Sequence, residues 1–131
     1  MEANHTIKSM STSSAPSAVG PYSQGILAGK TLYISGQLPL DPETGDFASG
    51  GIEEWTHQVI KNVRAIAEAA GAGLDRVVKT TIFLTDMGNF SAVNNVYAQY
   101  FNEPLPARCA IQVAGLPKDA DIEMEAIVYL P

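Results

Sequence analysis

The stretch Pro104–Pro117, PLPARCAIQVAGLP, begins and ends with proline, and between the prolines its residues alternate in character. An alternation of period two predicts a strand whose successive side chains point to opposite sides of a sheet. One set consists of Ala107, Cys109, Ile111 and Val113, and the other of Arg108, Ala110 and Gln112. We expect the first set to face the core, with Cys109 buried and Arg108 on the more polar face beside Ala110. A guanidinium fixed in this way suits a carboxylate or a phosphate.

The totals limit the class of protein. A chain of 131 residues, 46% of them hydrophobic, is long enough for one folded domain with a sizeable core. A formal net charge of −6 disfavours general binding to nucleic acid. The sequence has no apolar run of membrane-spanning length, and its N-terminus lacks the apolar block of a secretory signal. We therefore expect a soluble, cytoplasmic protein.

The pattern along the chain predicts an α+β domain over residues 15–131, preceded by a flexible N-terminal tail, 1–14, rich in Ser and Thr. Strands are expected at 24–28, 31–38, 77–84, 107–113 and 121–130, and helices at 53–70 and 90–101. Two helices can cover only one face of such a sheet. The other face would carry Tyr33, Val77 and Phe83, which are too apolar to face bulk water. Self-association through that face, with sites between subunits, is the expectation.

Arg108 and Glu123 each fall on the more polar face of a predicted strand. They suit a site in which the guanidinium binds a carboxylate and the glutamate holds or activates water. They suit a structural salt bridge equally well, and the pattern leaves both interpretations open. The two histidines, His5 and His57, lie in the tail and on a helix, so a Ser-His-Asp triad has no support.

Three other places are ambiguous. Tyr22 follows the Gly20-Pro21 turn and either packs at a sheet edge or lines a cleft. Gly36 interrupts a strand, which indicates a bulge or an exposed backbone N–H beside the Ser35 hydroxyl. Asn94 lies beside the apolar stripe of the second helix, where an amide is either solvated or orients a ligand.

Five motifs, in this order and spacing, resemble those of the reactive intermediate deaminase family, RidA/YjgF. They are GPYSQG at 20–25, ISGQLP at 34–39, VKTTIFL at 78–84, PAR at 106–108 and LPKDADIEMEA at 116–126. The resemblance runs from about Ala15 to the C-terminus and leaves the N-terminal segment outside it.

The resemblance implies a chorismate-mutase-like α+β fold and a homotrimer with three clefts between subunits. It also implies hydrolysis of enamine/imine intermediates, such as 2-aminoacrylate/2-iminopropanoate and 2-iminobutanoate, to 2-oxo acids and ammonia. Pyridoxal-phosphate-dependent dehydratases release these intermediates. The family enzyme itself uses no cofactor and no metal.

The resemblance assigns roles by position. Arg108 would bind the substrate carboxylate, and Glu123 would position or activate the attacking water. The cleft would be lined by Tyr22, Ser35, Gly36 and Asn94. Ala110 stands where some members carry a cysteine that helps to hold the water, so here that contact would be missing.

Two other classes of function compete with an imine deaminase. One is an endoribonuclease that inhibits translation, an activity reported for some relatives, which the acidic charge balance disfavours. The other is a non-catalytic module that binds small carboxylates or acts like a chaperone. Turnover of 2-iminopropanoate separates the enzyme from the module.

Overall fold

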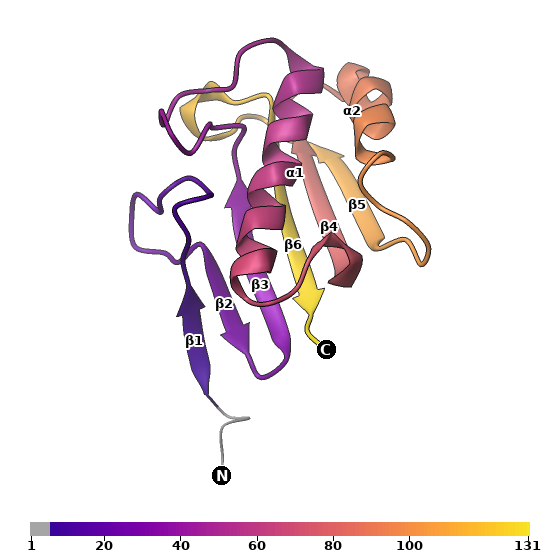
Figure 1. Cartoon of the computed structure of the whole chain (residues 1–131). Helices are drawn as coiled ribbons and strands as arrows, with labels where there is room; N and C mark the ends of the chain where they lie inside the picture. The colour runs from indigo at the N-terminus through magenta and orange to yellow at the C-terminus, as the bar shows by residue number, and fades with distance from the viewer. Residues whose placement is uncertain (1–5) are drawn as a thin grey trace.

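The computed structural model describes residues 6–131 and shows one six-stranded sheet with two helices on one face (Figure 1). The strands are β1 (Ile7–Met10), β2 (Gly25–Ala28), β3 (Thr31–Gln37), β4 (Val77–Leu84), β5 (Ala107–Gln112) and β6 (Ile122–Tyr129). The helices are α1 (Ile52–Ala69) and α2 (Phe90–Tyr97). The α+β class and the two helices on one face are confirmed.

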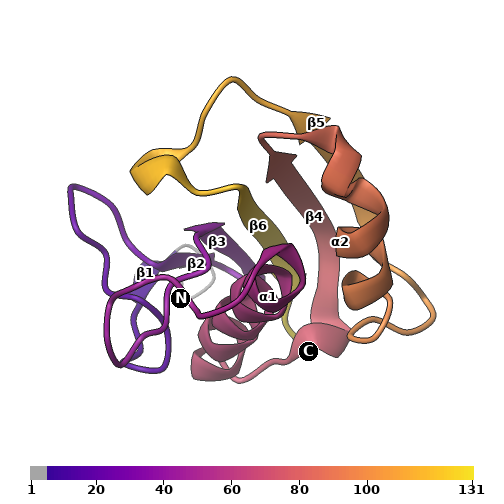
Figure 2. The same ribbon diagram turned by 90° about the horizontal axis from the view of Figure 1, so that it is seen from above.

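The strand order is β1-β2-β3-β6-β4-β5. All neighbours are antiparallel except β4 and β5, which are parallel. The C-terminal strand β6 lies between β3 and β4, so α1 carries the chain across it, and α2 carries the chain from β4 to β5. Both crossings pass over the same face, as the view from above shows (Figure 2). Neither α1 nor α2 lies on the opposite face of the sheet.

The core lies between α1 and the central strands. The helix places Val59, Val63 and Ile66 against the sheet at the 3–4 spacing of one apolar stripe, and all three are fully buried. On the sheet side Leu32 and Val128 are equally buried. Burying each such side chain stabilises the fold by about 1.5–3 kcal/mol. This packing fixes the position of β6 and hence of the side chains that β6 presents on its other face.

The N-terminal prediction is wrong for the part of residues 1–14 that the structure describes. Residues 7–10 form the edge strand β1, antiparallel to β2. The segment that follows is held by Gln24, whose side-chain Oε1 accepts a hydrogen bond from the Thr12 backbone N–H at 2.7 Å and whose Nε2 donates to the Pro16 carbonyl at 2.7 Å. Residues 7–10 form a strand because they pair with β2, since their own sequence does not alternate. The rest of the predicted tail, residues 1–5, lies outside the described part.

Two β-bulges shift the faces predicted from simple alternation. One lies at Gly36, between Ile34 and Gln37, as the interrupted strand indicated. The other lies between Val77 and Lys79. Because of it Val77 belongs to the core, with 5% of its surface exposed, whereas Val78 is 47% exposed. The assignment of Val77 to the open face was therefore wrong.

The prediction for β5 is inverted. β5 is an edge strand with most residues exposed, and Cys109 is exposed rather than buried. Cys109 and Ile111 pair with Thr81 and Phe83 on the open face. Ala110 pairs with the buried Ile82 and packs, half-buried, against the core. Arg108 therefore shares the helix-covered face, and the apolar set points away from the helices.

The open face keeps an apolar character. Tyr33 and Tyr129 are each 50% exposed and Ile111 is 40% exposed, in line with the expectation for this surface. Self-association through this face stays a prediction. Among the helices of residues 6–131, none has both the length and the apolar character needed to cross a bilayer.

Candidate functional site

Arg108 is held by α2. Its guanidinium Nη1 donates a hydrogen bond of 2.7 Å to the side-chain oxygen of Asn94. The guanidinium carbon lies 4.9 Å from the centre of the Tyr97 ring and 5.4 Å from that of Phe90. Such cation–π contacts stabilise a guanidinium by about 0.5–1 kcal/mol each at exposed sites. One hydrogen bond and two rings together limit the rotamers of a side chain that is otherwise open to solvent.

The sequence of α2 explains this support. Phe90, Asn94 and Tyr97 stand at i, i+4 and i+7, so they share one side of the helix. The Tyr97 hydroxyl is hydrogen-bonded to the Thr80 hydroxyl at 2.8 Å in a buried position. Burial raises the pKa of Tyr97 above its usual value. The helix ends at Tyr97, earlier than predicted, and Asn89 makes no side-chain cap.

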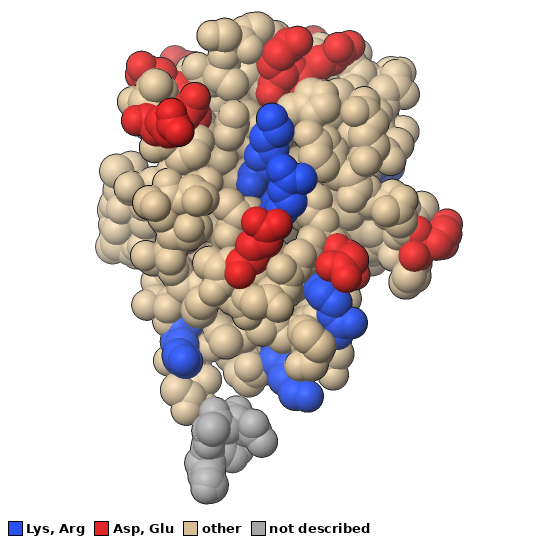
Figure 3. All heavy atoms as spheres, in the orientation of Figure 1, with Lys and Arg blue, Asp and Glu red and all other residues tan. Residues whose placement is uncertain are grey.

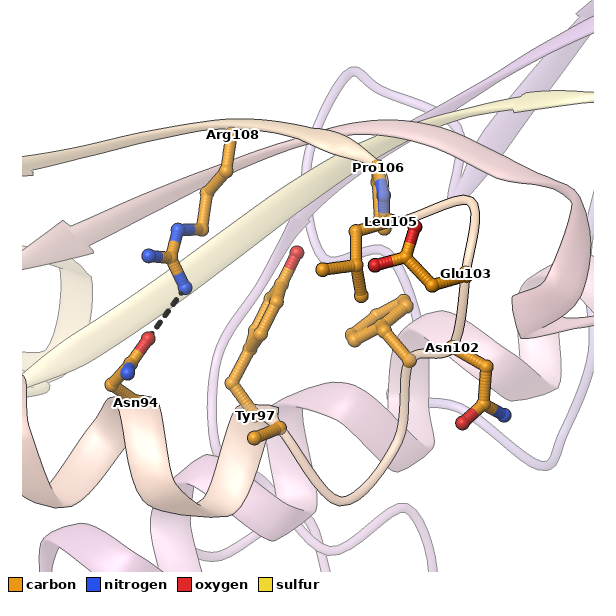
Figure 4. Close-up of a pocket in the computed structure, with 9 residues that line it drawn as sticks. Asn94, Tyr97, Asn102, Glu103, Leu105, Pro106 and Arg108 are labelled. Carbon is orange, nitrogen blue, oxygen red and sulfur yellow. Dashed lines mark hydrogen bonds between the residues drawn. The ribbon is translucent and has the colours of Figure 1, made fainter.

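A cleft of about 650 Å³ opens beside Arg108. It is lined by Asn94, Tyr97, Ala98, Phe101, Asn102, Glu103, Leu105, Pro106 and Arg108. Figure 4 shows the guanidinium reaching toward Asn94 on one side of the Tyr97 ring, with the loop residues on the other side. The cleft therefore offers a fixed cation above an aromatic floor, which suits a carboxylate.

Glu123 lies on β6 and is half-buried. Burial, and then the charge of Glu125, raise the pKa of Glu123 above its usual value. A raised pKa brings a carboxylate closer to the range in which it can take up and return a proton near neutral pH. The effect of Glu125 follows from the β6 alternation, which puts Glu123 and Glu125 on the same face.

The Gly36 bulge lies directly against this carboxylate. A side chain at position 36 would overlap the Glu123 Oε2 atom, and its Cβ would lie 2.8 Å from Cδ. The neighbouring Ser35 donates from Oγ to the Ser23 carbonyl at 2.6 Å and from its backbone N–H to the Gln24 carbonyl at 3.0 Å. The bulge predicted at Gly36 is therefore confirmed, and it lies close to the Glu123 side chain, whereas an exposed backbone N–H that meets a ligand stays a prediction.

Tyr22 lies on the segment that leads into β2 and is 51% exposed. Its backbone N–H bonds to the Gly20 carbonyl at 2.9 Å. With Ser23 and Gln24 it borders a separate hollow of about 480 Å³ along residues 9–18. Within the described chain Tyr22 is not among the residues that line the Arg108 cleft.

The structure separates the predicted residues into two groups. Arg108 pairs with Thr80 and Glu123 pairs with Phe83, and these two β4 residues have opposite parity. Arg108 and Glu123 thus leave opposite faces of the sheet. The salt bridge between them, one of the two interpretations left open, is wrong within one chain. Arg108 and Asn94 form one group, and Ser35, Gly36 and Glu123 form the other.

Phe90 and Tyr97 were missed as supports for the arginine. The helical pattern contains the signal, because they and Asn94 recur on one side of α2. What the pattern lacked was the position of β5, which depends on its parallel pairing with β4. Within residues 6–131 no group of three or more His, Cys, Asp or Glu side chains is placed to hold a metal ion.

Comparisons with known proteins agree with this architecture and its motifs. The model of the family described as Endoribonuclease L-PSP matches residues 12–130. The human 2-iminobutanoate/2-iminopropanoate deaminase is 50% identical over 118 residues, which cover 90% of this chain and 86% of that protein. The chain belongs to the RidA/YjgF family.

Solved structures of family members share the fold. RidA from the Antarctic bacterium Psychrobacter sp. PAMC 21119 is 46% identical, with a TM-score of 0.91 over 94% of this chain and 99% of that chain. TdcF from E. coli, solved with bound serine, is 39% identical, with a TM-score of 0.90 over 95% of this chain and 99% of that chain. The mixed sheet with two helices is thus the architecture of RidA proteins.

Proposed function

We propose that this RidA-family protein is a hydrolytic deaminase of small 2-imino acids, among them 2-iminopropanoate and 2-iminobutanoate. The observation that carries the proposal is the pre-oriented Arg108 guanidinium in an open cleft, held by Asn94 and two rings. The 50% identity to a human protein named for this activity supports it. So does the serine bound to TdcF, which shows that a family member holds a small amino acid.

The chemistry needs little more than positioning. Arg108 binds the carboxylate of the imine as a bidentate pair. Water adds to the imine carbon while Glu123 takes one of its protons and returns it to the nitrogen, which gives a carbinolamine. The carbinolamine hydroxyl then gives up its proton, which passes to the nitrogen, and the C–N bond breaks to release ammonia. The remaining hydroxyl becomes the carbonyl of the 2-oxo acid. The imine carbon is already electrophilic, so holding it next to an oriented water is the main contribution.

This assignment requires two copies of the chain, because Arg108 and Glu123 lie on opposite faces of one sheet. In the proposal the open faces associate in a homotrimer. One subunit supplies Arg108 and Asn94, and its neighbour supplies Glu123, Gly36, Ser35 and Tyr22. The half-exposed aromatic residues of the open face support association there. Ala110 lies on the Arg108 side and packs half-buried against the core, and in the proposal it borders the shared site.

Mixing two impaired variants tests both the carboxylate clamp and the sharing of the site between subunits. Arg108→Ala removes the carboxylate clamp and abolishes measurable acceleration, while Glu123→Gln removes the base and lowers the rate about a hundredfold or more. The trimer stays intact in both. In trimers reassembled from equal amounts of both, a shared site regains both wild-type residues with a chance of about one in four. We expect about a quarter of wild-type turnover. No recovery, with mixed trimers verified by mass, would refute the shared site, and near-wild-type turnover by Arg108→Ala would refute the clamp.

The family description also names an endoribonuclease. The net charge of −6 disfavours affinity for RNA. On the face that carries the helices, acidic side chains gather at the end away from the N-terminus (Figure 3). Ligand binding without imine turnover would instead indicate a non-catalytic small-carboxylate module.

A further inference from the structure

The cleft beside Arg108 has a second charged group on its far side. The loop after α2 contributes Glu103 and Leu105 to the lining. Both side chains are exposed, Leu105 to 57%. Figure 4 shows them across the Tyr97 ring from the guanidinium, with the Glu103 carboxylate directed back toward Leu105. The cleft thus presents a cation, an apolar middle and an anion in that order.

We propose that Glu103 is a specificity-determining residue that selects the side chain of the imine by its charge. The site favours 2-imino acids whose aliphatic side chain is neutral or ends in a cation, and disfavours those with a second carboxylate. This inference rests on the proposed function, since it takes the substrate carboxylate to be bound at Arg108.

The lining of the cleft gives the side chain of the bound imine one direction in which to extend. With the carboxylate on Arg108, the rest of the molecule can extend past Tyr97, whose hydroxyl is already bonded to Thr80. The ring therefore offers an apolar surface, and the exposed Leu105 continues it. Methylene groups fit this middle part. Beyond it lies Glu103, which attracts a terminal cation and repels a terminal anion.

The exposure of Glu103 sets the size of the expected discrimination between imines. A charge on a solvent-exposed rim acts through a high effective dielectric, so the discrimination is modest. We expect about a three- to tenfold ratio in kcat/KM between cationic and anionic side chains of similar length. Added salt should reduce this ratio, because exposed charges are screened.

The experiment measures kcat/KM for three imines generated in place by amino acid oxidases from norvaline, arginine and glutamate, with unreacted imine trapped by semicarbazide. Values for the arginine and glutamate imines are divided by the norvaline value for each variant. Glu103→Gln should lower the arginine-to-glutamate ratio about threefold or more, and Glu103→Lys should invert the preference. The matched control is Glu68→Gln, which removes the same charge from an exposed position on α1.

Each outcome decides something. A ratio that neither Glu103 variant changes overturns the inference, while turnover of the norvaline imine upholds the proposed function. An equal shift in Glu68→Gln assigns the effect to net charge and also overturns the inference. A ratio independent of salt contradicts its electrostatic origin. Failure of the wild-type protein to hydrolyse any of the three imines refutes the proposed function and the inference with it.

Discussion

The two faces of the sheet hold their candidate residues in different ways. On the helix-covered face, Arg108 is exposed but oriented by side chains of α2, with one hydrogen bond and two rings. On the open face, Glu123 is half-buried, and its environment is made by the backbone of Gly36 and by a second carboxylate. The comparison teaches that the candidate anion-binding residue and the candidate proton acceptor lie on faces that the sheet of one chain keeps apart.

Beyond the loss expected for Arg108→Ala, the largest effect is expected on the open face. Glu123→Gln should lower kcat/KM for 2-iminopropanoate about a hundredfold or more, since a positioned base contributes at least that much. In the wild type, activity should fall as the pH decreases through the raised pKa of Glu123, because the protonated carboxyl cannot accept a proton. A pH–rate profile checks this, and an unchanged acidic limb in the variant would contradict it.

Glu123→Gln should raise stability at neutral pH although it lowers activity. Because the pKa of Glu123 is raised in the folded state, its proton stabilises the fold below the usual carboxyl range, and this stabilisation is lost as the pH rises through the raised value. Glu123→Gln removes the penalty for the buried charge. The variant should therefore unfold at a higher temperature than the wild type at neutral pH, with a smaller difference near pH 4.

A smaller effect is expected from Gly36→Ala, which pushes the Glu123 carboxylate aside without removing it. We expect about a tenfold lower kcat/KM with a change in unfolding free energy of about 1 kcal/mol or less, since the displaced atoms end a flexible side chain. Gly115→Ala is the matched control, because a Cβ there meets nothing within 4 Å. Equal losses in the two variants would break the link between Gly36 and Glu123.

The smallest effect belongs to the helix-covered face. Tyr97→Phe keeps the ring under Arg108 but loses the buried hydrogen bond to Thr80. It should cost about 1 kcal/mol of stability and change KM about two- to threefold. Tyr100→Phe serves as a comparison, since its hydroxyl bonds to His57 Nδ1, away from Arg108. Denaturant unfolding and steady-state kinetics measure both, and a large loss of activity in Tyr97→Phe would mean that the hydroxyl itself acts.

Much of the fold was predictable from local pattern. The bounds of β4 matched, and α1 ended within one residue of its prediction, because a β-branched run and an amphipathic stripe are local signals. β1 was missed because four residues without alternation become a strand only by pairing with β2. The faces of β5 were inverted for a related reason. Its apolar set was assumed to face this chain's own core, whereas β5 is an edge strand that turns Cys109 and Ile111 to the open side.

The sequence by itself determined the family, the α+β class and the identity of the candidate residues, because motifs of fixed spacing and local periodicity carry that information. Only the tertiary structure decided that Arg108 and Glu123 face opposite ways, because facing depends on strand order, register and bulges that long-range pairing sets. The same pairing placed Arg108 over α2 and Glu123 against Gly36. A site that uses both residues therefore belongs to an assembly of chains.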